Sequence, residues 1–394
     1  MSFEPTLEES DARRPIYLDN AATTPLDPRV RAAMLGALDA GAGNASAMHA
    51  PGRRVRACIE AARAEVATLI NAPAEAIVFT SGATESDNLA ILGSARGNRA
   101  RGHRVVSLKT EHRAVLDACT SLEREGFAVT LLAPGHAGLL DPAALAAALT
   151  PTTTLASVML VNNETGVVQD IAALAAVCHA RGVLLHVDAA QAAGRVPIDV
   201  VALDVDLMSL SAHKIHGPVG VGALYVRRAP RPTLEPLQYG GGQEGGLRSG
   251  SLAAHQIAGM GEAFRLASSE GLAESARLRA LSERLWQGLA PLGGVHLNGD
   301  VLRRAPHIVN VSFEGVDGEA LLLELEGLVL ASGAACSAES GEPSYVLRAL
   351  GRPDVLAAAS LRFSLGRLTT TAEVEAAIAE VRTGVARLRA LGPP

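Results

Sequence analysis

Short apolar runs alternate with longer helical patterns through the first two thirds of the chain. The runs lack internal polar alternation, and helical stretches lie between them at Glu85–Gly93, His112–Glu125, Pro142–Ala148 and Ile171–Ala180. This order predicts a mostly parallel sheet with helices on both faces, and therefore an α/β fold. The seven candidate strands are Ala76–Thr80, Arg104–Leu108, Ala128–Leu132, Leu155–Val161, Val183–Val187, Asp206–Ser211 and Val221–Val226. Ligands bind such sheets at the carboxyl ends of the strands.

A second, smaller α+β domain is predicted after residues 228–250, a segment rich in Pro, Gly and Arg. A long helical tract follows at Ala253–Leu289, then a strand-like run at Ile308–Phe313 and a helix from Gly318. The expected domain bounds are 24–265 for the large domain, and 1–23 together with 266–394 for the small domain.

Composition narrows the class of protein. The 394 residues are 48% hydrophobic and 19% charged, as in a globular enzyme, and the net charge of −6 argues against direct nucleic-acid binding. The first fifteen residues lack the features of a secretory signal, and no apolar run is long enough for a membrane span. The four cysteines form no C-x-x-C pair, so we expect no intrinsic metal site and a cytoplasmic, reducing location.

The segment from Thr80 to Asn88 follows a predicted strand and opens a predicted helix. Backbone N–H groups at a helix start, flanked by small residues, suit a phosphate, and Thr84 adds a hydroxyl. An ordinary strand–turn–helix cap explains the same residues.

Two further strand ends carry Asp188 and Lys214. Taken singly, Asp188 is explained as a helix cap and Lys214 as a solvated loop lysine. Together with the phosphate segment they supply an acid, an amine and an anion site. These are the three anchors that pyridoxal phosphate (PLP) needs for its ring nitrogen, aldehyde and phosphate.

Three other residues are candidates by position. His112 follows a strand and has a side chain that moves protons near neutral pH. Asn163 also follows a strand, although Asn and Gly favour turns in any case. Arg362 lies in an apolar run, where its guanidinium matches a carboxylate or a structural ion pair.

The cysteines fall into two groups. Cys58, Cys119 and Cys178 lie in helical patterns and are predicted to be packing residues. Cys336 lies in a segment with small residues between glycines, which predicts a mobile loop that brings a thiol to different partners. An exposed cysteine without function is the alternative.

The motifs in order resemble the NifS/IscS-type cysteine desulfurases, which have the class-V aminotransferase-like PLP fold (fold type I). Any one segment is weak, but the set runs in constant order from Tyr17 onward. The matching segments are Tyr17–Thr24, Phe79–Asn88, Thr110–His112, Val161–Glu164, His186–Asp188, Ser211–Lys214, Arg248–Gly250, Ser332–Cys336 and Pro343–Gly351.

The resemblance implies roles around the cofactor ring. Lys214 binds PLP covalently and later moves protons, while Asp188 pairs with the ring nitrogen. Gln191 bonds the phenolic oxygen, and His112 stacks on the ring as a third catalytic residue beside Lys214 and the cysteine.

The resemblance also implies roles for the phosphate, the substrate and the sulfur. Asn163 contacts the cofactor and, with Arg362, holds the carboxylate side of the substrate. Cys336 attacks the substrate sulfur, and it is also able to ligate transiently an iron–sulfur cluster shared with a scaffold. The phosphate ligands are the backbone of Ala83, Thr84, Ser211, His213, and Ser251 from the other subunit of a homodimer.

The implied activity converts L-cysteine to L-alanine and leaves a persulfide on the enzyme. That sulfur would pass to an iron–sulfur scaffold or another acceptor protein, for iron–sulfur cluster assembly or tRNA thiolation. Two alternatives stay open: a PLP enzyme such as an aminotransferase or selenocysteine lyase, and a non-catalytic scaffold of the same fold.

Some positions depart from the family's pattern. Gly245 stands where relatives commonly have Arg, which is expected to loosen a contact near the dimer interface or substrate entrance. Ala212 replaces a usual Gly and is tolerable if its φ is negative. The chain also ends without the further tail that relatives often carry for the scaffold.

Overall fold

The computed structural model describes residues 15–41, 43–332 and 342–392. Its main sheet has seven strands in the order β2-β8-β7-β6-β5-β3-β4. Within this sheet β8 runs opposite to the other six strands, which all run in one direction, so the expected mostly parallel sheet is confirmed. The strands are β2 (Ile77–Thr80), β3 (Arg104–Leu108), β4 (Ala128–Leu132), β5 (Thr153–Met159), β6 (Leu184–Asp188), β7 (Leu207–Ser211) and β8 (Gly222–Val226).

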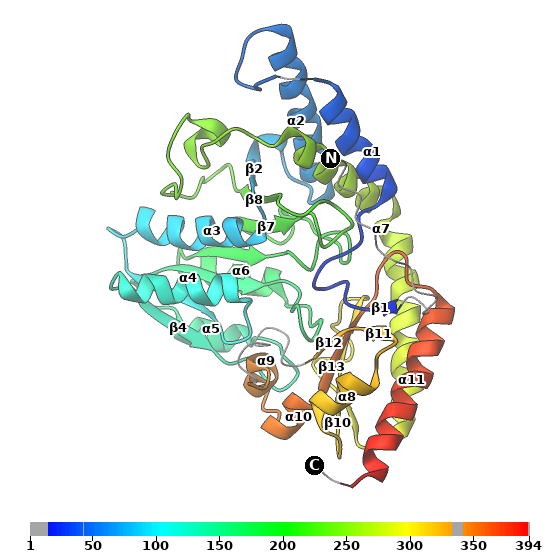
Figure 1. Cartoon of the computed structure of the whole chain (residues 1–394). Helices are drawn as coiled ribbons and strands as arrows, with labels where there is room; N and C mark the ends of the chain where they lie inside the picture. Colours follow the sequence, from blue (N-terminus) through cyan, green and yellow to red (C-terminus); the bar gives the residue numbers. More distant parts are fainter. Residues whose placement is uncertain (1–14, 42, 333–341, 393–394) are drawn as a thin grey trace.

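Helices cover both faces of this sheet (Figure 1). One face packs through Val105 and Leu155 against α3 (Ala83–Gly97) and α4 (Arg113–Arg124). The strands are buried along their whole length near the centre, which is why their sequences show no polar alternation. The helices of the other face are α2 (Ala50–Leu69), α5 (Pro142–Ala148), α6 (Ile171–His179) and the first half of α7 (Ala254–Leu289).

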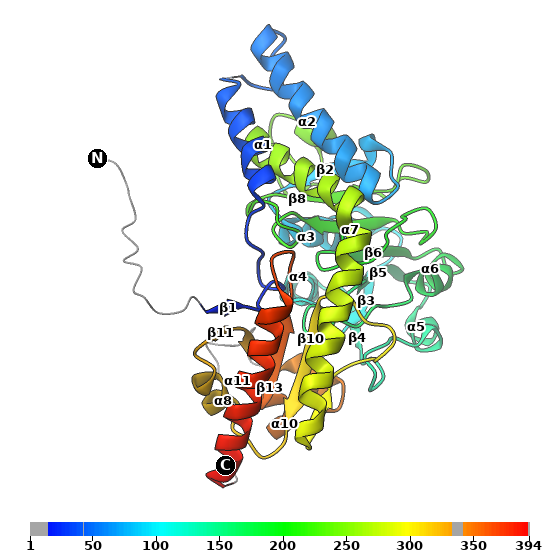
Figure 2. The same cartoon turned by 90° about the vertical axis from the view of Figure 1, so that its right-hand side faces the viewer.

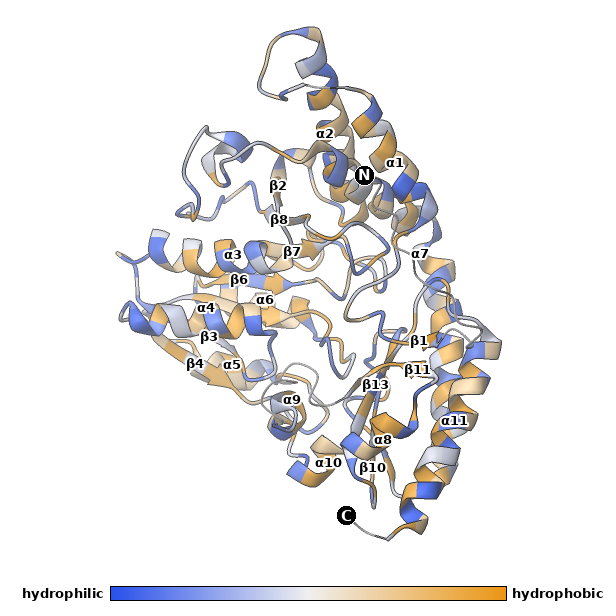
Figure 3. Cartoon of the chain, in the orientation of Figure 1, coloured by the Kyte–Doolittle hydropathy of each residue, from blue (hydrophilic) through white to orange (hydrophobic). Residues whose placement is uncertain are grey.

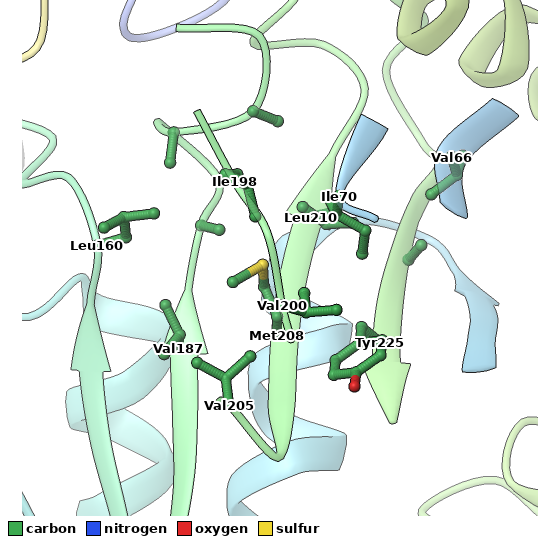
Figure 4. Packing of buried hydrophobic residues seen from close by; sticks show 14 of the residues in the cluster. Val66, Ile70, Leu160, Val187, Ile198, Val200, Val205, Met208, Leu210 and Tyr225 are labelled. Atoms are coloured by element: carbon green, nitrogen blue, oxygen red, sulfur yellow. The ribbon is translucent and has the colours of Figure 1, made fainter. Parts of the chain in front are cut away.

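The larger core lies on that second face. Figure 4 shows Val187, Met208 and Leu210 of the central strands in one cluster with Val66 of α2 and with Ile70, the residue after that helix. Aliphatic side chains dominate it because the chain has few aromatic residues. Rigid packing here holds the strand ends that form the site.

A four-stranded sheet in the order β12-β13-β10-β9 lies beside the main sheet. Its own core includes Leu18, near the N-terminus, and Leu278 from the second half of α7. Its strands are β9 (Val295–Leu297), β10 (Ile308–Phe313), β12 (Ala331–Ser332) and β13 (Ser360–Ser364). Its helices are α8 (Gly318–Glu324), α9 (Tyr345–Ala349), α10 (Asp354–Ala358) and α11 (Thr371–Ala390).

The long helix α7 joins the two cores. Figure 2 shows it beginning beside α1 (Pro28–Asp39) and α2 and ending beside α11. Hydrophobic and hydrophilic residues alternate along these helices (Figure 3), which fits elements with one buried face. The two cores agree with a large and a small domain, while the bounds at 23/24 and 265/266 stay a prediction.

An N-terminal strap, residues 18–24, crosses between the two sheets. Asn20 N bonds Ser364 O of β13, and Thr24 N bonds His213 O beside Lys214. The strap thereby ties the loop that carries Lys214 to the smaller sheet. In the described part of the chain, no helix is long and apolar enough to cross a membrane.

Candidate active site

A cavity of about 610 Å³ opens where the carboxyl ends of the main strands meet the strap and the smaller sheet. The loops after β2, β3, β5, β6 and β7 all contribute to its walls, as expected for this sheet type. The predicted site residues that line it are Ala83, Thr84, His112, Asn163, Asp188, Gln191, Ser211, His213, Lys214 and Arg362.

One corner of the cavity is suited to a phosphate. Helix α3 begins at Ala83, and its cap residue Gly82 makes no side-chain cap hydrogen bond. The Ser211 hydroxyl faces this region from β7; it is buried and has no hydrogen-bond partner among the described residues. Uncapped N–H groups and an orphaned hydroxyl both need an acceptor, which an anion supplies.

His213 completes this corner. Its Nδ1 lies 3.1 Å from Thr23 Oγ1 of the strap. Burial, together with the charge of Lys214, lowers the pKa of the His213 ring to about 4. The ring is therefore neutral near pH 7, and it offers a hydrogen bond rather than a charge.

Asp188 stands at the end of β6, where its Oδ1 accepts a hydrogen bond from Ala190 N at 2.8 Å. No helix follows it, so the reading of Asp188 as a helix cap is wrong. Burial raises the pKa of this carboxyl, while the hydrogen bond from Ala190 N and the charge of Lys214 oppose that shift. A protonated ring nitrogen opposite Asp188 would favour the ionised form.

His112 caps the N-terminus of α4 and lines the cavity. Its Nδ1 accepts a hydrogen bond from Ala114 N at 3.2 Å. Burial lowers the pKa of the ring, so the ring is neutral at pH 7 and carries its proton on Nε2. The cap thus fixes which nitrogen is able to give a proton.

Lys214 lies in the loop after β7, where strap carbonyls hold its amine. The Nζ group donates to Ala21 O at 2.5 Å and to Ala22 O at 2.7 Å. The strap therefore contacts the lysine amine through two backbone oxygens. The sequence identifies residues 17–24 only as a segment that matches the family, and it predicts no contact for them.

Arg362 enters the cavity from β13 of the smaller sheet. Its Nη2 pairs with Asp19 at 2.7 Å, and its Nη1 donates to Asn163 O at 2.9 Å. Its Nε and the side-chain oxygen of Asn163 are buried without hydrogen-bond partners among the described residues. A carboxylate would satisfy the Nε donor of Arg362, and a ligand donor would satisfy the Asn163 oxygen.

Ser251 lies apart from this cavity. It is exposed and lines a second hollow of about 780 Å³, together with Leu38 of α1 and Glu244. Its predicted contact with the phosphate of another subunit stays a prediction.

Two of the noted departures can be placed. Gly245 has a φ of 64° in a short 3-10 turn (Gln243–Gly246), a conformation that an arginine adopts only with strain. Ala212 is buried and is not among the residues of positive φ, which meets the condition for its tolerance.

Cys336 lies outside the described residues. The other three cysteines occur within helices as predicted, Cys58 half-buried and Cys119 and Cys178 buried. Burial raises the pKa of the Cys119 and Cys178 thiols to about 12. Those two thiols are protonated near pH 7 and are poor nucleophiles.

The chain belongs to the aminotransferase class-V family, whose pattern matches residues 16–377. It is 55% identical over 382 residues to Cysteine desulfurase IscS of Photorhabdus laumondii subsp. laumondii, which covers 96% of this chain and 95% of that relative. The resemblance to NifS/IscS-type enzymes is therefore confirmed, and PLP is the cofactor that this family implies.

Solved structures agree with the family. A protein titled "NIFS-LIKE PROTEIN" has a TM-score of 0.88 at 31% identity, over 95% of this chain and 100% of that chain. Another, titled "SspA in complex with cysteine", has a TM-score of 0.81 at 35% identity, over 90% and 99%. The second title places cysteine in a protein of this fold.

Proposed function

We propose that the chain is a PLP-dependent cysteine desulfurase that converts L-cysteine to L-alanine and retains the sulfur as a persulfide on Cys336. The observation that carries this proposal is the meeting of Lys214, Asp188 and the uncapped start of α3 at one cavity. These side chains match the amine, acid and phosphate anchors of PLP, in a chain 55% identical to an enzyme named for this activity.

The residues divide the work of holding the cofactor. Lys214 provides the amine for the aldehyde, and Asp188 provides the acid for the ring nitrogen. Gln191 provides an amide for the ring oxygen. The phosphate would be held by α3 through Ala83 and Thr84, by Ser211 and His213, and by Ser251 of a second subunit. PLP, when bound, takes up electron density released at the α-carbon of an amino acid.

The substrate site follows from the smaller sheet. Arg362 Nε offers an unused donor for the carboxylate of cysteine, and Asn163 Oδ1 offers an acceptor for a donor group of the substrate or cofactor beside it. Lys214 and His112 are the groups in the cavity that move protons, His112 from its Nε2. The Cys336 thiolate attacks the substrate sulfur, so an S–S bond forms while the substrate's C–S bond breaks. Protonation of the β-carbon that carried the sulfur then gives alanine.

The assembly and the acceptor are part of the same proposal. The exposed Leu38 and Ser251 border one surface hollow, which supports a homodimer that buries this region. The persulfide would pass to an iron–sulfur scaffold or another acceptor, for cluster assembly or tRNA thiolation. A reducing cytoplasm would keep the Cys336 thiol available between turnovers.

Replacement of Cys336 tests the assignment against an aminotransferase. Cys336→Ala is expected to keep the visible absorbance of bound PLP and to release no sulfide from cysteine, because the attacking thiol is gone. Cys58→Ala is the control, since Cys58 lies in α2 outside the cavity, and it is expected to release sulfide at the wild-type rate. Normal sulfide release by Cys336→Ala would refute the assignment.

Lys214→Ala separates the enzyme from a non-catalytic scaffold. Loss of the amine is expected to abolish the covalent cofactor absorbance and sulfide release together. Survival of the PLP absorbance and of all partner functions in this variant would make the enzymatic reading wrong.

A further inference from the structure

His307 is a buried histidine beside the cavity to which the proposed function gives no role. It directly precedes β10 of the smaller sheet, and its side chain is 2% exposed. Its Nε2 lies 3.5 Å from Gln191 Oε1, which belongs to the loop after β6 of the main sheet. The ring therefore joins the smaller sheet to a residue of the cofactor site.

A second contact determines which way the Gln191 amide points. Its Nε2 lies 2.8 Å from Ala21 O, the same carbonyl that accepts a bond from Lys214 Nζ. A carbonyl oxygen only accepts, so the amide nitrogen must face Ala21 and the amide oxygen must face His307. Gln191 also lines the cavity, where its second N–H group is available to a ligand.

The protonation of His307 agrees with this arrangement. Burial lowers the pKa of the ring well below its usual range, and the charges of Arg195, Arg362 and Lys214 act in the same direction. A neutral ring carries one proton. Nδ1 is buried with no partner among the described residues. A proton on Nε2 is thus the better arrangement, because it faces the Gln191 oxygen, whereas a bare Nε2 would set two acceptors against each other.

We propose that His307 is a positioning residue whose Nε2–H group holds Gln191 Oε1 and thereby keeps the amide NH₂ group directed to Ala21 and the cavity. The contact is long, and its effect comes from selecting one of two amide orientations. This inference rests on the proposed function, since it takes Gln191 as the ligand of the PLP ring oxygen. It makes the smaller sheet part of the cofactor's environment.

The pH midpoint of the bound cofactor's visible absorbance tests the inference in the full-length holoenzyme. Gln191→Ala removes the amide, and His307→Leu removes only the group that orients it. Both single variants are expected to move the midpoint in the same direction, by about half to one pH unit. The double variant is expected to move the midpoint no further than Gln191→Ala alone. His307→Gln is the conservative control, because its amide nitrogen replaces the imidazole Nε2, and it is expected to stay near the wild-type midpoint.

Three results would overturn the inference. The first is an unchanged pH midpoint in His307→Leu, and the second is additive midpoint shifts in the double variant. The third is a lowered melting temperature of His307→Leu without the midpoint shift that Gln191→Ala shows. Failure of the proposed function looks different, because the wild-type protein would then show no PLP absorbance or form no alanine from cysteine. A wild type that passes both tests, with an unresponsive His307→Leu variant, contradicts the role of His307 alone.

Discussion

Glu164 is a residue whose neighbours the sequence did not reveal. It follows Asn163 in the turn after β5, and its Oε1 is buried without a partner among the described residues. Burial raises the pKa of the carboxyl to about 7, although Ser344 and the charge of Arg362 act in the opposite direction. The folded protein therefore prefers the protonated acid.

This gives a pH-dependent effect on stability. Because the folded-state pKa is above the unfolded value of about 4.3, the wild type loses stability as pH rises from about 4.3 to about 7, and the loss persists above pH 7. Glu164→Gln removes the ionisation. We therefore expect the difference in free energy of unfolding between the variant and the wild type to favour the variant by up to about 3 kcal/mol more at pH 8 than at pH 4. Urea unfolding of both proteins at the two pH values measures this. A difference independent of pH would contradict it.

At the scale of elements, strand β8 determines how closely the turn before α3, which forms the proposed phosphate site, approaches the strand ends. It runs antiparallel between β2 and β7, so Gly222 at its start pairs with both Thr80 and Ser211. A β-carbon on Gly222 would come within 2.6 Å of the backbone carbonyl carbon of Gly82. The absence of a side chain lets the turn before α3 fold back over the strand ends.

Gly222→Ala is therefore expected to destabilise the protein by about 1–3 kcal/mol and to weaken PLP binding, because the Gly82 turn must shift. Gly36→Ala is the matched control in α1, since no heavy atom lies within 4 Å of the added carbon. The control is expected to gain about 0.5–1 kcal/mol from helix propensity. Thermal unfolding and PLP titration of the two variants check both expectations, and equal behaviour would refute the crowding argument.

At the scale of the whole molecule, a buried ionic network fastens the two cores together. Glu274 of α7 pairs with Arg195 of the main-sheet side and with Arg367, which follows β13. Arg367 in turn pairs with Asp27 at the end of the loop before α1. Arg195 and Glu274 are almost fully buried, so neither charge is exposed to water that could replace its partner.

Glu274→Gln leaves the Arg195 charge buried without its counter-ion, and we expect a loss of about 3 kcal/mol. Glu270→Gln is the control on the same helix, where the pair with Arg29 is roughly half exposed, and we expect a loss below about 1 kcal/mol. Chemical denaturation at pH 7 distinguishes them. Similar losses in both variants would show that the network does not fasten the cores.

The sequence alone determined the main sheet and the order of the site. Strand runs such as Arg104–Leu108 match the observed bounds, because buried parallel strands leave an uninterrupted apolar pattern. Lys214, Asp188 and the start of α3 were located by their places at strand ends, and the motif order identified the family.

Only the tertiary structure decided which groups touch. The carbonyls of Ala21 and Ala22 hold Lys214, and His307 reaches Gln191 across more than a hundred residues of chain. Backbone oxygens have no signature in a sequence, and a lone buried histidine looks like any core histidine. Such contacts depend on how the strap and the smaller sheet pack against the main sheet, and local patterns of hydrophobic and polar residues do not encode that packing.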